Sequence, residues 1–128
     1  MEAKNGRILI VDDEVSLCAT LSGYLSGLGE CATAGSAERA IEILEKEAFR
    51  LVLTDISMPG MSGLELCRYV RIHYPNTAVI VMSMHTSKPY EAASIGRGAF
   101  GFLPKPFDTK LLLEMVRAAL SWRKETDP

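Results

Sequence analysis

The stretch LVLTDISMPGMSG, residues 51–63, begins with continuous aliphatic residues and ends in a turn-forming sequence. The run Leu51–Leu53 is typical of a strand that is buried on both faces of a parallel sheet. Asp55 then places one carboxylate at the end of that run, and the proline and glycines of residues 59–63 break the pattern. A buried strand that ends in an acid and a sharp turn is either a solvated strand end or a reactive site.

The length and composition indicate one globular domain. At 128 residues the chain is long enough for a single hydrophobic core, and 48% hydrophobic and 23% charged residues are typical of a folded protein. We therefore expect one domain over residues 1–128, with an ordered core at about residues 6–124, and we look for one site.

Charge and hydropathy exclude several classes of protein. The net charge is −2 with both signs scattered, so no basic stripe is available for direct binding to nucleic acid. No apolar stretch is long enough to span a membrane, and residues 1–6 lack the apolar segment of a signal peptide. We expect a cytoplasmic protein without membrane contact. The three cysteines, Cys18, Cys31 and Cys67, have no metal-binding spacing and are predicted to be small buried hydrophobic residues.

Short apolar runs alternate with helical patterns along the whole chain. Five such runs are expected to be strands: residues 7–11, 31–34, 51–54, 78–82 and 101–103. Helices are predicted from about Val15 to a stop at Gly29, after a cap at Ser36, from about Leu64 to Tyr74, from Pro89 to about Ile95, and after a cap at Asp108. This alternation predicts an α/β fold, a flavodoxin-like doubly wound sheet of five parallel strands in the order 2-1-3-4-5 with five helices.

Polar residues follow four of the predicted strands at one edge of the sheet. Asp12 and Asp13 follow the first strand, Asp55 the third, Ser83 the fourth and Lys105 the fifth. Ligands of open α/β sheets bind beyond the carboxyl ends of the strands. Each residue alone has an ordinary explanation as a helix cap, a turn hydroxyl or a surface charge, but those explanations do not predict that all of them gather at one edge.

Three carboxylates at that edge would repel one another and require a cation. Oxygen ligands without histidine or cysteine suit a hard ion, and a small number of protein ligands favours Mg²⁺ over Ca²⁺. A carboxylate beside such an ion, a lysine and a hydroxyl is also suited to act as a nucleophile that forms an aspartyl phosphate. The residue inventory therefore matches phosphoryl transfer.

The sequence resembles the receiver domains of two-component response regulators over nearly its whole length. The resemblance rests on ILIVDDE (8–14), LVLTDISMPGMSGLEL (51–66), VIVMS (79–83) and GAFGFLPKPF (98–107). It implies a signalling domain that catalyses its own phosphorylation and dephosphorylation without being a conventional enzyme. Its partners would be a sensor histidine kinase or phosphotransfer protein and an effector domain or downstream protein, and a phosphorylation-dependent homodimer is compatible with it.

The resemblance also implies a role for each site residue. Asp55 would accept the phosphoryl group from a phosphohistidine, and Asp12 and Asp13 would position Mg²⁺, with Asp13, Asp55 and the backbone carbonyl of Ser57 as its ligands. Lys105 would contact the phosphoryl oxygens, and its bond to Pro106 is expected to be cis. Ser83 and Phe102 would be the switch residues that respond to phosphorylation.

The chain departs from the family pattern in places. Met84 is bulkier than the small residue usual after the switch hydroxyl, which leaves the lifetime of the phosphoryl group open, and His85 is expected to be an exposed loop residue. Phe102 replaces the tyrosine of many relatives and has an equally good explanation as a core residue. The Pro59, Gly60 and Gly63 cluster is interpreted as the turn that lets Asp55 face the cation.

Three other functions remain open from the residues. The topology alone permits a flavodoxin-like cofactor binder, although no phosphate-binding glycine-rich loop follows the first strand. A metal-dependent phosphatase with an aspartyl intermediate would usually have a second acid where Ser57 stands. The third is a degenerate receiver domain that binds partners without phosphate. The sequence does not distinguish a free-standing regulator from a piece of a longer one, and it does not identify the kinase or the output.

Overall fold

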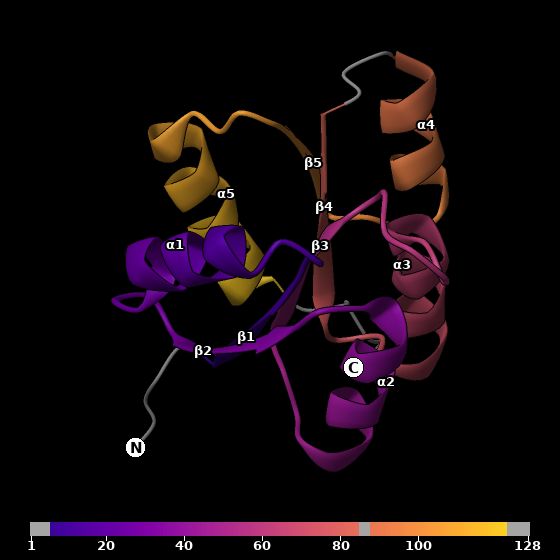
Figure 1. Ribbon diagram of the computed structural model, residues 1–128, viewed down its shortest axis with the longest axis horizontal. Coiled ribbons are helices and arrows are strands. Elements are labelled where there is room, and N and C mark those ends of the chain that lie inside the picture. The colour runs from indigo at the N-terminus through magenta and orange to yellow at the C-terminus, as the bar shows by residue number, and fades with distance from the viewer. Residues whose placement is uncertain (1–5, 85–87, 123–128) are drawn as a thin grey trace, which may run out of the picture.

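Five parallel strands form one sheet in the order β2-β1-β3-β4-β5 (Figure 1). The computed structural model describes residues 6–84 and 88–122. The strands are β1 (Arg7–Val11), β2 (Glu30–Ala34), β3 (Leu51–Asp55), β4 (Ala78–Ser83) and β5 (Gly101–Pro104). The predicted strand order is confirmed, and strand order reverses beside β1, which pairs with both β2 and β3.

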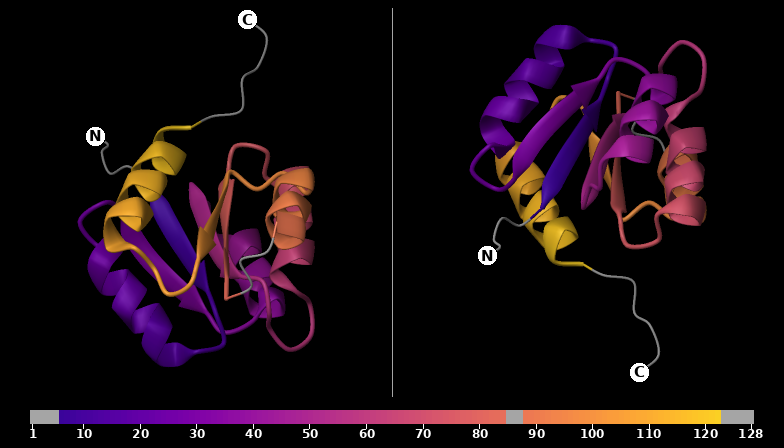
Figure 2. Two further views of the ribbon diagram at one scale, coloured as in Figure 1. Left: turned by 90° about the horizontal axis from the view of Figure 1, so that it is seen from above. Right: turned by 90° about the horizontal axis from the view of Figure 1, so that it is seen from below.

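Helices cover both faces of the sheet, as expected for a doubly wound fold (Figures 1 and 2). The described helices are α1 (Val15–Leu25), α2 (Ala37–Lys46), α3 (Gly63–His73), α4 (Lys88–Gly96) and α5 (Thr109–Ser121). Helices α1 and α5 lie on one face, and α2, α3 and α4 lie on the other. Among the described residues, no helix has both the length and the apolar character needed to cross a bilayer.

The strands supply the core by alternation. Ile8, Ile10 and Leu53 point into the cluster beneath α1 and α5, whereas Leu9 and Val52 point into the cluster beneath α2 and α3. Every residue of β3 and β4 is buried, which explains their aliphatic runs Leu51–Leu53 and Ala78–Met82. Because a fully buried leucine or isoleucine side chain contributes roughly 1.5–3 kcal/mol, these two strands fix the centre of the sheet.

Local capping defines where three helices begin. The Ser36 side chain accepts a hydrogen bond from the backbone N–H of Arg39, and Asp108 accepts from the first turn of α5, so both predicted caps are confirmed. Helix α3 begins after a reciprocal capping box formed by Ser62 and Glu65. These caps place the N-termini of α2, α3 and α5 beside the strand ends that precede them.

The first helix is shorter than predicted and buries fewer of its apolar residues. It ends at Leu25, whose carbonyl accepts hydrogen bonds from the N–H groups of Leu28 and Gly29 in a closing turn. Val15 is 79% exposed, so the apolar pattern overestimated the buried face. Gly29 is required for close approach, since a Cβ there would lie 2.5 Å from the carbonyl oxygen of Gly6.

The cysteines follow the prediction in two of three cases. Cys18 in α1 and Cys67 in α3 are buried, but Cys31 is only half-buried. The difference arises because Cys31 lies on β2, which is an edge strand and pairs with β1 on one side only.

Candidate functional site

The carboxyl ends of β1, β3, β4 and β5 bring the predicted polar residues to one edge of the sheet. Asp12 directly follows β1, and Asp55 is the last residue of β3. Ser83 is the last residue of β4, and Lys105 directly follows β5. The register pairs Asp55 with Met82 and Ser83 with Pro104, so these ends are aligned.

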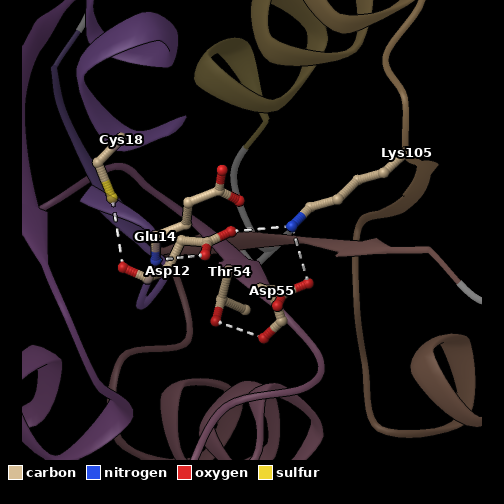
Figure 3. A network of polar contacts seen from close by, with 6 residues as sticks. All are labelled: Asp12, Glu14, Cys18, Thr54, Asp55 and Lys105. Atoms are coloured by element: carbon tan, nitrogen blue, oxygen red, sulfur yellow. Dashed lines mark hydrogen bonds and ion pairs between the residues drawn. The ribbon is translucent and has the colours of Figure 1, made fainter. Parts of the chain in front are cut away.

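Lys105 reaches from β5 across the end of the sheet to two carboxylates (Figure 3). Its Nζ lies 3.0 Å from Oδ2 of Asp12 and 3.3 Å from Oδ1 of Asp55. The lysine side chain is 13% exposed, and those of Asp12 and Asp55 are 2% and 11% exposed. An ammonium group is thus held between two carboxylates in a largely desolvated setting, where electrostatic interactions are stronger than in water.

Asp12 is fixed by backbone and side-chain contacts. Its Oδ1 accepts a hydrogen bond of 2.9 Å from the backbone N–H of Glu14, and its own N–H donates to the carbonyl of Ala34 on β2. The Cys18 thiol of α1 donates to the Asp12 carbonyl oxygen at 3.4 Å (Figure 3). The direction of the Asp12 carboxylate is therefore set before any ligand binds.

Three carboxylates gather at this point. Asp12, Asp13 and Asp55 each offer an oxygen, and these oxygens lie within 4.8 Å of one another. Asp13 is exposed, so one side of the cluster is open to solvent. Three acids with one lysine leave an excess of negative charge, and an all-oxygen donor set beside open solvent fits a hydrated hard cation such as Mg²⁺.

Burial and neighbouring charges shift the pKa values of Asp55 and Lys105. Desolvation raises the pKa of Asp55 above its ordinary value, Lys105 opposes this rise, and the charge of Asp12 adds to it. For Lys105, burial alone would lower the pKa. The hydrogen bond to Asp12 and the charges of Asp55 and Asp12 together outweigh burial and leave the pKa raised. The lysine is therefore a firmly charged group, whereas ionised Asp55 is incompletely neutralised.

The glycine at residue 63 is needed because the chain folds back onto Asp55. A Cβ at Gly63 would lie 1.9 Å from the Asp55 carbonyl oxygen, and the Gly63 N–H donates to the Ile56 carbonyl at 2.9 Å. The Ile56 N–H in turn donates to Met82 at the end of β4. The sequence pattern indicated that Gly63 is part of the turn that lets Asp55 face the cation. Gly63 is instead the first residue of α3, and a glycine is required there for steric space.

The turn conformation belongs to Gly60, and a contact from α2 accompanies it. Gly60 has φ +79°, a conformation that favours glycine. Glu38 in the first turn of α2 accepts a hydrogen bond of 2.9 Å from the backbone N–H of Met61. The sequence patterns did not reveal this contact, because its partners are 23 residues apart and no motif joins them.

The remaining predicted residues lie around the cluster. Ser57 is exposed in the loop after β3, and Ser83 is 1% exposed, with its carbonyl accepting a 2.8 Å hydrogen bond from the N–H of Lys105. Phe102 is partly buried against the core beneath α2 and α3. The Lys105–Pro106 bond is cis, as expected.

The residues that depart from the family pattern differ in how far the structure describes them. Met84 is 75% exposed, so its side chain is directed largely into solvent. His85 lies outside the described residues.

A sequence profile of the response regulator receiver domain matches residues 8–117. The chain belongs to this family. The receiver domain is 36% identical over 111 residues to the response regulator protein FleR of Pseudomonas aeruginosa, covering 86% of this chain and 24% of FleR. It is 33% identical over 123 residues to the DNA-binding transcriptional regulator NtrC of Escherichia coli, covering 95% of this chain and 26% of NtrC. The receiver domain thus spans about a quarter of the length of these relatives.

Solved structures of receiver domains have the same fold. The BeF3-activated DrrB receiver domain superposes with a TM-score of 0.84 at 29% identity, covering 91% of this chain and 98% of that one. The chemotaxis protein CheY4 of Vibrio cholerae superposes with a TM-score of 0.84 at 30% identity, covering 91% of this chain and 99% of CheY4. NtrX of Brucella abortus, solved in complex with ATP, gives 0.83 at 34% identity and covers 91% of this chain and 27% of that one. The protein is therefore a receiver domain of two-component signalling.

Proposed function

We propose that Asp55 accepts a phosphoryl group, with Mg²⁺ bound, from a phosphohistidine of a sensor histidine kinase or phosphotransfer protein. The observation that supports this most is the Lys105 ammonium, which lies 3.0 Å from Asp12 and 3.3 Å from Asp55 inside a three-carboxylate cluster. A positive charge beside a candidate nucleophile, at a site that also favours a cation, suits the transfer of an anionic group.

In the proposed reaction, a carboxylate oxygen of Asp55 forms a bond to phosphorus while the P–N bond to the donor histidine breaks and its electron pair returns to the imidazole. Asp55 faces Lys105, which would then exchange part of its ion pair for the phosphoryl oxygens. Asp12, Asp13, Asp55 and the Ser57 carbonyl are the groups that would hold Mg²⁺. The ion, when bound, would supply charge neutralisation for the transferred oxygens.

Ser83 and Phe102 are proposed as the switch residues. Ser83 is buried at the end of β4, and Phe102 is partly buried on the neighbouring strand β5. A phosphoryl group adds roughly −1.5 to −2 charges at Asp55, which favours any arrangement in which a hydroxyl or N–H satisfies its oxygens. A near-complete shift between two states requires about 5.5 kcal/mol of differential stabilisation, so we expect partial activity in the absence of phosphate.

The proposed unit is one receiver domain over residues 1–128 that relays its state to an effector domain or a downstream protein. FleR and NtrC are several times longer than this chain, which is consistent with a receiver domain that controls a further domain. A phosphorylation-dependent homodimer is one form that this output would take. We also propose that the domain acts in the cytoplasm.

Intact-mass measurement tests the proposed chemistry. The protein is incubated with a small-molecule phosphodonor with and without MgCl₂, in parallel with Asp55→Asn. We expect one phosphoryl adduct on the wild type, dependent on Mg²⁺, and none on Asp55→Asn. An equal adduct on both proteins would remove Asp55 from its assigned role, and no adduct on either would favour a receiver domain that acts without phosphate. Steady hydrolysis of phosphoesters would favour a phosphatase instead.

A further inference from the structure

The loop that joins β3 to α3 carries one of the proposed ion ligands. We call residues 56–62 the acceptor loop; Ser57 lies in it, exposed, two residues after Asp55. The proposed ligand is the backbone carbonyl of Ser57 and not its side chain. The direction of this carbonyl is therefore set by the conformation of the loop backbone. Whatever fixes that backbone therefore also fixes a proposed ligand of Mg²⁺.

Two hydrogen bonds and a capping box hold the ends of the acceptor loop. The Ile56 N–H donates to the Met82 carbonyl on β4, and the Gly63 N–H donates to the Ile56 carbonyl, both at 2.9 Å. Ser62 and Glu65 close the capping box at the start of α3. These contacts come from within the β3-α3-β4 unit. Within the loop, Met58 is buried in the core beneath α2 and α3 and Met61 packs against that core, but these side-chain contacts do not bond the backbone N–H of Met61.

Glu38 contacts the acceptor loop from a different element. It belongs to the first turn of α2, and its Oε2 accepts a hydrogen bond of 2.9 Å from the Met61 N–H. A Cβ at Gly60 would lie 2.8 Å from Oε2 and 3.3 Å from Oε1 of Glu38. The Glu38 carboxylate therefore lies directly against the backbone of the acceptor loop.

The charge state of Glu38 supports a strong contact. The Glu38 carboxyl is ionised at neutral pH, and the hydrogen bond from Met61 lowers its pKa further. A hydrogen bond to an ionised acceptor is stronger and more directional than one between neutral groups. The position in the first turn of α2 also favours a negative charge.

We infer that Glu38 is a positioning residue for the proposed phosphoryl transfer: it holds the acceptor loop in the conformation that presents the Ser57 carbonyl to the ion. This inference rests on the proposed function, because it gives the loop a role only if an ion binds there. Glu38 acts through Met61 and the loop backbone and does not itself contact the reacting atoms. Its hydrogen-bond geometry, rather than its charge alone, is the property that matters.

Three substitutions on α2 separate these properties. Glu38→Ala removes the acceptor, Glu38→Gln keeps an oxygen acceptor without the charge, and Glu42→Ala removes another exposed acid from the same helix, one that pairs with Arg39 and not with the loop. Because Glu38 is exposed, no substitution removes buried apolar surface, and circular dichroism checks that each variant folds. The probe is MgCl₂ alone, titrated calorimetrically, with amide hydrogen exchange of Met61 followed by NMR.

Removing a group that bonds a metal ligand directly costs about 10–100-fold in affinity. Glu38 bonds Met61 and not Ser57, so we expect Glu38→Ala to weaken Mg²⁺ binding by less, up to about tenfold. The Met61 amide should exchange faster in that variant. Glu38→Gln should restore most of both properties, and Glu42→Ala should match the wild type. The inference is overturned if Glu38→Ala binds Mg²⁺ like the wild type, or if Glu38→Gln is as weak as Glu38→Ala.

The same experiment separates this inference from the proposed function. If the wild type does not bind Mg²⁺ and forms no phosphoryl adduct, the proposed function fails. If the wild type binds the ion and forms the adduct while Glu38→Ala equals it in both, only the role of Glu38 fails.

Discussion

A methyl group added at Gly63 would collide with the backbone of Asp55. The new Cβ would lie 1.9 Å from the Asp55 carbonyl oxygen and 2.8 Å from its carbonyl carbon. Relief requires a shift of backbone, because neither atom belongs to a flexible side chain. The substitution Gly63→Ala therefore tests whether the start of α3 is packed against the end of β3 as described.

The size of the effect follows from the overlap. An ordinary contact between carbon and oxygen is about 3.3 Å, so the backbone must separate by roughly 1.4 Å. Overpacking typically costs about 1–3 kcal/mol, and a collision with backbone belongs at the upper end, or about 3 kcal/mol. Alanine recovers up to ~1 kcal/mol of helix propensity, so the net loss is about 2–3 kcal/mol. At about 4 °C per kcal/mol for a domain of this size, Tm should fall by about 8–12 °C.

Gly23→Ala is the matched control. Gly23 lies in α1, is exposed, and has nothing within 4 Å of an added Cβ. The same chemical change should stabilise that helix by up to ~1 kcal/mol. Thermal and urea denaturation of both variants measure the difference, and the Mg²⁺-dependent adduct on Asp55 should form more slowly in Gly63→Ala because the Asp55 backbone moves.

The two substitutions should therefore have opposite signs. If Gly63→Ala were as stable as Gly23→Ala, the start of α3 would not pack against the Asp55 backbone, and the steric reason for glycine at residue 63 would be wrong.

Three further predictions concern the charged groups. Lys105→Ala should lower the free energy of unfolding at pH 7 by about 2 kcal/mol, measured by urea denaturation. This is less than the roughly 3–5 kcal/mol lost when a fully buried ion pair is broken, because the lysine side chain is 13% exposed. Addition of MgCl₂ should restore part of the lost stability. Since the folded-state pKa of Asp55 is raised, its ionisation destabilises the fold as pH rises above the unfolded value of about 3.9. Asp55→Asn should therefore raise the urea midpoint at pH 7 but not at about pH 3, where the carboxyl is protonated in both states. Arg71 donates to the carbonyls of Thr77 and Pro75, and its guanidinium lies 5.0 Å from the ring centre of Trp122. Arg71→Ala should cost about 1–2 kcal/mol and alter the fluorescence of this single tryptophan.

Sequence reasoning predicted those parts of the fold that depend on local pattern. The apolar runs in β3 and β4 follow from burial on both faces, and the caps at Ser36 and Asp108 depend on residues within one helical turn. The meeting of Asp12 with Lys105 followed from topology, because parallel strands end at the same edge.

Features that depend on packing between distant segments were not predictable. The apolar pattern of α1 continues past Leu25, yet the helix ends there. An apolar residue carries no information about whether a neighbouring element covers it, so the pattern did not predict where the helix ends. The contact between Glu38 and Met61 joins two elements without a shared motif. Glycine is required at residue 63 because the Asp55 backbone lies against it, and no local sequence pattern shows that proximity.

A crystal structure of the protein with Mg²⁺ and beryllofluoride, the group named for the solved DrrB receiver domain, tests the central claim most directly. We expect beryllofluoride on a carboxylate oxygen of Asp55, within hydrogen-bond distance of Lys105 Nζ, and the ion held by Asp13, Asp55 and the Ser57 carbonyl. An unmodified Asp55 still paired with Lys105, with the ion bound elsewhere, would contradict it.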